Sequence, residues 1–200
     1  MSDGGGGGER RRLLLSDASF AVGSVCFAFA ALPSVAVALG AIVTNVVFVV
    51  GSVFFTLGAG LALGVPNRSS SIIQFVGTLF FNASTTIALA AAVPAGAAGG
   101  TGWRPDAYGS ICFLVSSLIA VAAVARQRGS RRDGAGAVLN LLGSVLFGFA
   151  AVGAFELPGT DALLSVFWTG VGTVGGAVCF LTAAVIGLLP APRPLALRTK

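Results

Sequence analysis

Residues 18–67 form an uninterrupted stretch without a charged side chain. A helix crosses the hydrocarbon core of a bilayer with about 20 apolar residues, so this stretch is long enough for more than one crossing. The whole chain has the same character, with 56% hydrophobic and 10% charged residues, whereas soluble globular domains carry about 25% charged residues. The sequence therefore predicts an all-α membrane protein.

Turn-forming residues divide the apolar sequence into six predicted transmembrane helices. Pro33 and Gly40 bracket the first break, and Pro66 with Asn67 forms the second. The later breaks are the segments "PAGAAGGTGWRP", "RQRGSRRDGAG" and "ELPGTD", and "PAPRP" ends the last helix because proline cannot continue the helical hydrogen bonds. The predicted spans are residues 13–32, 41–64, 69–92, 107–126, 135–156 and 162–188.

The predicted domain organisation follows from these spans. Residues 1–12 are a glycine-rich polar tail that we expect to be disordered, residues 94–106 an external loop, and residues 191–200 a cytoplasmic tail. The remaining segments, 13–93 and 107–190, each contain three helices. The basic start could also introduce a cleaved leader ending near "AFAA". The echo of "DASFAVGSVCF" in "DAYGSICF" favours a retained helix instead.

The basic residues predict the orientation of the chain. If the amino terminus is cytoplasmic, six crossings place every lysine and arginine inside except Arg104, as the positive-inside rule requires. Five crossings would leave basic segments on both sides. We therefore expect a multi-pass protein of a cell (inner) membrane with both termini in the cytoplasm. Short basic clusters between apolar segments fit this topology, and they do not favour nucleic acid as a partner.

A five-residue pattern occurs once in each predicted helix: glycine, a small residue, two apolar residues and phenylalanine. Its copies are "GSVCF", "GSVFF", "GTLFF", "GSICF", "GSVLF" and "GAVCF", beginning at Gly23, Gly51, Gly77, Gly109, Gly143 and Gly176. Helices gain no hydrophobic drive from meeting each other in lipid, so small residues that let backbones approach closely favour their association. The phenylalanine lies on the same helix face as the glycine. We therefore predict that this pattern is a helix-packing motif.

The copies also predict an internal repeat. The segments "GSVFFTLGAGLALGVP" (51–66) and "GSVLFGFAAVGAFELP" (143–158) are identical at seven of sixteen positions, which pairs the second helix with the fifth. "GSVCF" and "GSICF" pair the first helix with the fourth and leave the third with the sixth. The sequence thus predicts two three-helix repeats. Because three is odd, the second repeat would enter the membrane from the opposite side, as an inverted repeat.

Three segments of the chain resemble a known group of proteins. "QFVGTLFFNASTT" (74–86), "WRPDAYGSICFLVSS" (103–117) and "NLLGSVLFGFAAVGAFELPGT" (140–160) are similar to uncharacterised multi-pass membrane proteins of high-GC actinobacteria, over about residues 18–190. The "GSxxF" helices resemble, more distantly, the small YrhK-like membrane domain. The resemblance implies a membrane location and a helical fold. It implies no activity and no functional residues.

The third predicted helix carries the most polar line of residues within the membrane. Gln74, Thr78, Asn82 and Thr86 follow one another at intervals of four and share one face. They could form hydrogen bonds between helices, or they could line a path or binding site for a small solute. We favour hydrogen bonds between helices, because the matching position in the sixth helix is Leu181. Asn140 presents the same choice.

Catalytic and metal-binding chemistry finds few candidates in this sequence. Histidine is absent, and the three cysteines, Cys26, Cys112 and Cys179, all occupy the fourth position of the packing motif. We interpret them as packing residues and expect no metal, no cofactor and no enzymatic activity.

Two functional hypotheses remain open. The first is a structural or interaction component of the membrane, with the lipid bilayer as its surroundings and self-association or another membrane protein as its contact. The alternative is a small neutral-solute transporter or channel that uses the polar face of the third helix. We expect no charged side chain within the membrane, and its absence disfavours coupling to ions.

Overall fold

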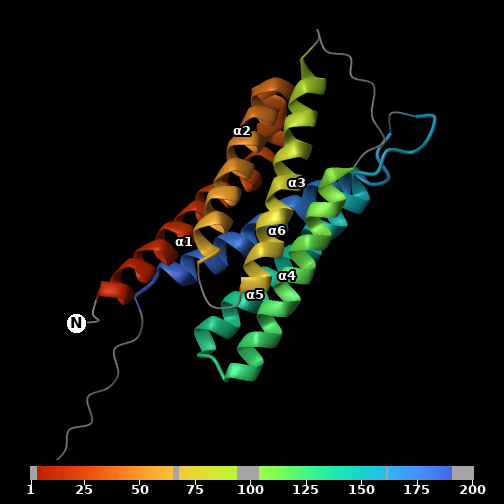
Figure 1. Ribbon diagram of the computed structural model, residues 1–200. Coiled ribbons are helices and arrows are strands. Elements are labelled where there is room, and N and C mark those ends of the chain that lie inside the picture. The colour runs from red at the N-terminus through yellow and green to blue at the C-terminus, as the bar shows by residue number, and fades with distance from the viewer. Residues whose placement is uncertain (1–3, 65–67, 94–103, 161, 191–200) are drawn as a thin grey trace, which may run out of the picture.

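The computed structural model describes residues 4–64, 68–93, 104–160 and 162–190. These residues form six helices: α1 (Gly4–Ala30), α2 (Pro33–Ala62), α3 (Arg68–Ala92), α4 (Pro105–Gln127), α5 (Arg131–Gly153) and α6 (Val166–Leu188) (Figure 1). All six are long and apolar enough to cross a membrane. The prediction of an all-α membrane protein with six transmembrane helices is therefore confirmed.

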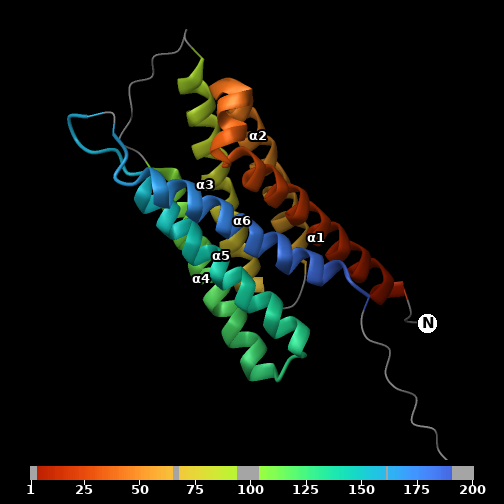
Figure 2. The ribbon, with the colours of Figure 1, turned by 180° about the vertical axis from the view of Figure 1, so that it is seen from behind.

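The six helices form a closed ring. Each helix packs against the next one along the chain, and α6 packs against α1. The helices alternate in direction, as Figures 1 and 2 show from opposite sides. The start of α1 and the end of α6 therefore lie on the same face as the end of α2, the start of α3 and the α4–α5 connection, and we call this the terminal face. The distal face holds the α1–α2 connection, the end of α3, the start of α4, the end of α5 and the start of α6.

The first two helices begin earlier than predicted. α1 starts at Gly4, so residues 4–12 are helical rather than disordered. Adding residues to an existing helix costs much less than starting one, and Arg12 holds this segment to α2 by donating to the Leu61 carbonyl. α2 starts directly at Pro33, which suits a first helical position because that position needs no N–H donor. The predicted break appears as a kink at Gly40, whose φ of 74° favours glycine.

The last two helices also differ from their predicted bounds. α5 starts at Arg131 because Ser130 and Asp133 form a capping box, in which each side chain accepts from the other's backbone N–H. α6 starts only at Val166, after Ser165 caps it by accepting from the Trp168 N–H. The described residues between α5 and α6, 154–160 and 162–165, are irregular apart from an isolated bridge between Glu156 and Leu163. The predicted break at "ELPGTD" is thus part of a longer connection.

The packing motif joins the helices into three hairpins: α1 with α2, α3 with α4, and α5 with α6. Within each hairpin the phenylalanine of one helix covers the motif glycine of the other, in both directions. A Cβ atom built on any of the six glycines would lie 2.6–3.2 Å from a ring carbon of the partner helix. All six copies have the same burial pattern, and their third residue is 37–59% exposed on the outside of the ring.

The motif phenylalanines meet on the ring axis as two stacked triangles. The six rings belong to Phe27, Phe55, Phe81, Phe113, Phe147 and Phe180. Centroids of the three rings from α1, α3 and α5 lie 5.6–6.3 Å apart. The ring from α6 lies 6.2 and 5.8 Å from those of α2 and α4. Rings of the same hairpin join the two triangles at 5.0–5.4 Å, distances typical of favourable aromatic pairs.

The predicted inverted pair of three-helix repeats is not confirmed. The helices follow one another around the ring in the order of the chain. A two-fold axis in the membrane plane would reverse this order around the ring. Such an axis therefore cannot superpose α1, α2 and α3 on α4, α5 and α6, respectively. The contacts of the motif instead repeat once per hairpin. The sequence similarity between helices is real, but the unit that repeats in the packing has two helices.

The close contact at the motif glycines can be tested within one helix. A Cβ at Gly143 would lie 3.0 Å from both the Gly176 carbonyl oxygen and the Phe180 ring, whereas a Cβ at Gly148 would have nothing within 4 Å. We expect Gly143→Ala to lower the free energy of unfolding by about 1 to 3 kcal/mol. Gly148→Ala should leave it unchanged or raise it by up to about 1 kcal/mol, because alanine favours the helix.

Unfolding of both variants in the same detergent, by heat or by denaturant, gives the comparison. Equal stability of the Gly143→Ala and Gly148→Ala proteins would show that the motif glycine is not a tight contact.

Candidate functional site

Two cavities lie on the ring axis, one on each side of the phenylalanine triangles. The terminal cavity, of about 340 Å³, is lined by residues of all six helices and reaches Phe180. The distal cavity, of about 90 Å³, reaches Phe27, Phe81 and Phe147. The triangle from α1, α3 and α5 thus borders the distal cavity, and the other triangle faces the terminal one. Together they separate the two cavities.

Positions that are equivalent in the three hairpins line the terminal cavity. Phe20, Gln74 and Asn140 each precede a motif glycine by three residues, and all three border the cavity. The residues eleven positions after the motif glycines of α2, α4 and α6 also border it, and they are Ala62, Ala120 and Gly187. The cavity is therefore a product of the hairpin repeat. At the position of Phe20, the other two hairpins contribute an amide to the cavity instead of a phenyl ring.

A carboxylate within α1 also lines the terminal cavity. Asp17 is half-buried there, and its carboxylate packs against Gly187, where a side chain would collide with it. The expectation of no charged side chain within the membrane is therefore wrong, because Asp17 lies inside both the predicted and the observed span, whereas Arg126 and Glu156 lie at the ends of their predicted spans. A signal for this role was present in the sequence. Asp17 precedes Phe20 by three residues and Gly23 by six, so it lies about one helical turn from Phe20 on the same side of α1.

Two arginines close helix ends on the terminal face. Arg12 and Arg132 each precede a motif glycine by eleven residues. Arg12 donates to the Leu61 carbonyl at the end of α2. Arg132 donates to carbonyl oxygens in the last turn of α6 and just beyond it, at Ile186, Gly187, Leu189 and Pro190. Cations at a helix carboxyl end satisfy free carbonyls and favour the helix dipole.

The distal cavity has its own polar residues. Asp106 and Thr173 line it, and each precedes a motif glycine by three residues, as Phe48 does in α2. Arg104 holds the Asp106 carboxylate through two hydrogen bonds of 3.0 and 2.6 Å and also donates to the Ala151 carbonyl. The hydrogen bonds to Asp106 raise the pKa of Arg104 above its ordinary value. Asp106 is therefore engaged in an ion pair.

The predicted polar face of the third helix does not lie along one surface. Asn82 donates to the Thr56 hydroxyl of α2 at 2.6 Å, and Thr78 is fully buried and donates to a carbonyl of its own helix. Gln74 lines the terminal cavity, whereas Thr86 is exposed on the outside of the ring. Residues four apart advance by about 40° around a helix. Over the twelve residues from Gln74 to Thr86 this drift turns the line away from the axis.

Hydroxyl groups join neighbouring hairpins at a second equivalent position. The residue after a motif glycine meets the residue eight positions after the motif glycine of the neighbouring helix in the adjacent hairpin. Ser52 pairs in this way with Thr85 at 3.0 Å, between α2 and α3. Ser144 pairs with Ser117 at 2.8 Å, between α5 and α4. Sequence reasoning missed Thr85 and Ser117, because their roles follow from the ring and not from one helix.

The third interface between hairpins lacks this pair. Ser24 of α1 holds the position of Ser144, but its partner position in α6 is Ala184. The Ser24 hydroxyl is fully buried and has no hydrogen-bond partner in the described part of the chain. An alanine at residue 184 explains this unpaired hydroxyl. The α6–α1 contact therefore depends on packing alone at this level.

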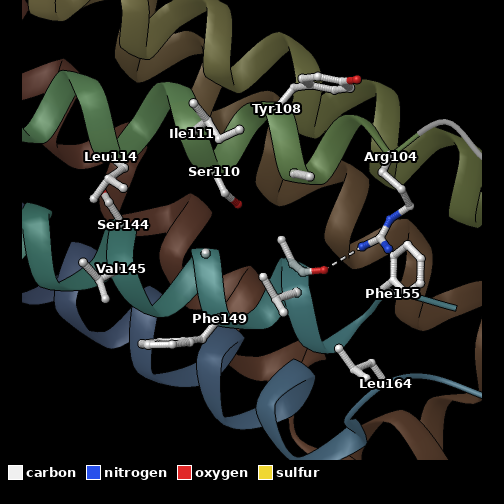
Figure 3. Close-up of a pocket in the computed structure, with 14 residues that line it drawn as sticks. Arg104, Tyr108, Ser110, Ile111, Leu114, Ser144, Val145, Phe149, Phe155 and Leu164 are labelled. Atoms are coloured by element: carbon white, nitrogen blue, oxygen red, sulfur yellow. Dashed lines mark hydrogen bonds between the residues drawn. The ribbon is translucent and has the colours of Figure 1, made fainter. Parts of the chain in front are cut away.

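An apolar groove of about 860 Å³ runs along the outside of the ring between α4 and α5 (Figure 3). Tyr108, Ile111, Phe149 and Val152 border it, and all four are exposed. Arg104 lies at one end with its guanidinium directed to the α5 backbone. The groove is lined mainly by side chains that suit contact with hydrocarbon.

The cysteines offer no combined site. Cys26, Cys112 and Cys179 are half-buried free thiols, one each on α1, α4 and α6. Among the described residues, no group of three metal-ligating side chains comes together.

The fold and the axial site define a ring of three helical hairpins whose centre is filled by phenylalanine. Comparisons with protein-family models, curated proteins and solved structures give no match.

The unpaired Ser24 hydroxyl leads to a prediction about Ala184→Ser. A serine at this position would supply the partner that Ser117 gives Ser144, and we expect it to raise the free energy of unfolding by about 0.6 kcal/mol. The same change in a Ser24→Ala protein should give no gain, since the new hydroxyl would lack its partner. Unfolding of the four proteins in a double-mutant cycle measures the coupling; an equal effect of Ala184→Ser in both backgrounds would refute the pairing.

Proposed function

We propose that this protein is a structural or interaction component of a cell membrane, and that it has no catalytic activity. The observation that carries this proposal is the closed ring axis. All six motif rings are 7% exposed or less, and each pairs with a glycine on its partner helix at a distance that leaves no room for a methyl group. Such a core favours a fixed shape over passage of a solute.

The outer surface supports the same proposal. Large apolar side chains are exposed on every helix, and the groove between α4 and α5 adds a concave surface of the same character. The lipid bilayer is the partner that this surface requires. Self-association or contact with another membrane protein would use the same exposed helices.

A small neutral-solute transporter or channel is the second candidate. The observation that favours it is the pair of cavities on one axis, with polar side chains on both sides of the phenylalanine triangles. Hydrophobic constrictions of this kind close pores in channels. The path would follow the ring axis and not the polar face of α3, because Asn82 is bonded to Thr56 and Thr86 faces outward.

We propose that the terminal face is cytoplasmic. Arg10, Arg11 and Arg12 precede the apolar part of α1 on this face, and the α4–α5 connection carries Arg128 between Arg126 and Arg131. The described part of the distal face carries Arg104, which is paired with Asp106. Such a difference supports a cytoplasmic location for both termini.

Permeability separates the two functional candidates. Liposomes that contain the purified protein should take up glycerol, an uncharged probe, at the same rate as protein-free liposomes, because the phenylalanine triangles close the axis. Stopped-flow light scattering measures this rate. Faster uptake with the wild-type protein would favour the channel and contradict the structural proposal.

A matched pair of variants in α5 tests the packing of the central phenyl rings through the free energy of unfolding. Phe147→Ala removes a ring that is 2% exposed and should lower the free energy of unfolding by about 3 to 5 kcal/mol. Phe149→Ala removes a ring that is 48% exposed and should cost far less.

The orientation can be tested with reporter fusions. Fusions after Gly99, Arg131 and Lys200 should report the outside, the cytoplasm and the cytoplasm, respectively, because only the first site lies between α3 and α4 on the distal face. Reporter activity at each site in intact cells provides the measurement. A cytoplasmic signal after Gly99 would reverse the proposed orientation.

A further inference from the structure

The terminal cavity presents polar side chains that the fold does not use. Asp17, Gln74 and Asn140 are half-buried and line this cavity of about 340 Å³. Within the described residues, their side chains form neither a hydrogen bond nor an ion pair at contact distance, unlike Ser16 in the same cavity, which donates to the Gly58 carbonyl. Polar groups that line a cavity without a protein partner keep their hydrogen-bonding capacity for water or for a ligand. Three such side chains around one cavity therefore provide the polar contacts that a ligand would need.

The charge of the cavity favours a cation. Its charged lining residues are Asp17 of α1 with Arg132 and Asp133 of α5, and the other four helices contribute none. Arg132 is committed to the carbonyl oxygens at the end of α6, and Asp133 is committed to the capping box with Ser130. The two carboxylates and one guanidinium leave the lining with one net negative charge. Asp17 feels the charge of Arg132, but it is the one of the three that makes no hydrogen bond within the described residues.

The rest of the lining fits an organic cation better than a bare metal ion. Phe20 and Phe180 line the cavity, and aromatic faces attract ammonium groups and shield their carbon atoms from water. The amide oxygens of Gln74 and Asn140 can accept hydrogen bonds from an ammonium or a hydroxyl group. A volume of about 340 Å³ accommodates a small molecule of several heavy atoms.

We propose that the terminal cavity is a binding site for a small organic ammonium ion, whose charge is balanced by Asp17. Gln74 and Asn140 orient the polar end of this ligand, and the two phenyl rings contact its carbon atoms. The proposal goes beyond the structural function and holds whether or not the axis conducts a solute, because the site lies on one side of the phenylalanine triangles.

Choline provides a direct probe. The thermal stability of the purified full-length protein in detergent is measured against choline chloride, with sodium chloride at the same concentration as the control for ionic strength. A second control is 3,3-dimethylbutan-1-ol, which has the shape of choline but no charge. We expect choline to raise the melting temperature in a saturable manner and both controls to have no effect.

Variants assign the binding to the cavity. Asp17→Asn should weaken choline binding by about tenfold or more, because it removes the charge partner of a partly desolvated cation. Glu156→Gln makes the same charge change in the exposed α5–α6 connection and should leave choline binding unchanged. Asn140→Leu keeps Asp17 and should weaken binding by about threefold to tenfold. It serves as the second test should the Asp17→Asn protein fail to fold.

Three results would overturn the proposal. One is a wild-type protein that shows no choline-dependent shift. Another is an equal shift with 3,3-dimethylbutan-1-ol, which would indicate an apolar cavity that does not read charge. The third is choline binding that survives both Asp17→Asn and Asn140→Leu at wild-type strength, which would place the binding elsewhere.

Discussion

The contact between a motif glycine and the phenylalanine of its partner helix is the interaction on which the rest of the structure depends. Inside a bilayer, lipid chains are as apolar as side chains, so helices associate only where they pack more closely than lipid can. The missing Cβ of the glycine allows that close approach, and the phenyl ring of the partner helix fills the space that the missing Cβ leaves. Because both helices of a hairpin carry the motif in opposite directions, each contact occurs twice. Three hairpins with the same contact then bring six phenyl rings to one axis. These side chains close the centre of the ring of helices.

The stacked triangles also determine where polar residues can lie. At the level of the rings, all inward positions are taken by glycine, a small residue and phenylalanine. The next inward position along each helix precedes the motif glycine by three residues, and it faces the terminal side in α1, α3 and α5 and the distal side in α2, α4 and α6. Cavities therefore form on both sides of the triangles. Their contents depend on few residues, such as Gln74 and Asn140 on one side and Asp106 and Thr173 on the other.

Much of the fold could be predicted from the sequence, because membrane-spanning length and the position of proline and glycine are local properties. The number of helices and the role of Gly51 or Gly143 follow from such properties. The grouping of the helices could not be obtained in this way, since similarity between two helices does not say which of them touch. The same limit explains the candidate site. Gln74 was aligned with Thr86 at intervals of four, whereas it shares the terminal cavity with Asn140, at the same position of another motif copy. Comparison of the six copies in register would have found that pair.

The hairpins share their packing but not their polarity, and this difference separates the scaffold from the site. The hairpin of α1 and α2 has phenylalanine at both axial positions, Phe20 and Phe48, and these rings pack against the central cluster. The other two hairpins have polar residues there, which leave space beside the triangles. Since these positions lie beyond the glycine contacts, a change at Gln74 or Asn140 alters the terminal cavity without disturbing a glycine and phenylalanine pair. The ring can therefore keep one architecture while the chemistry of its cavities changes.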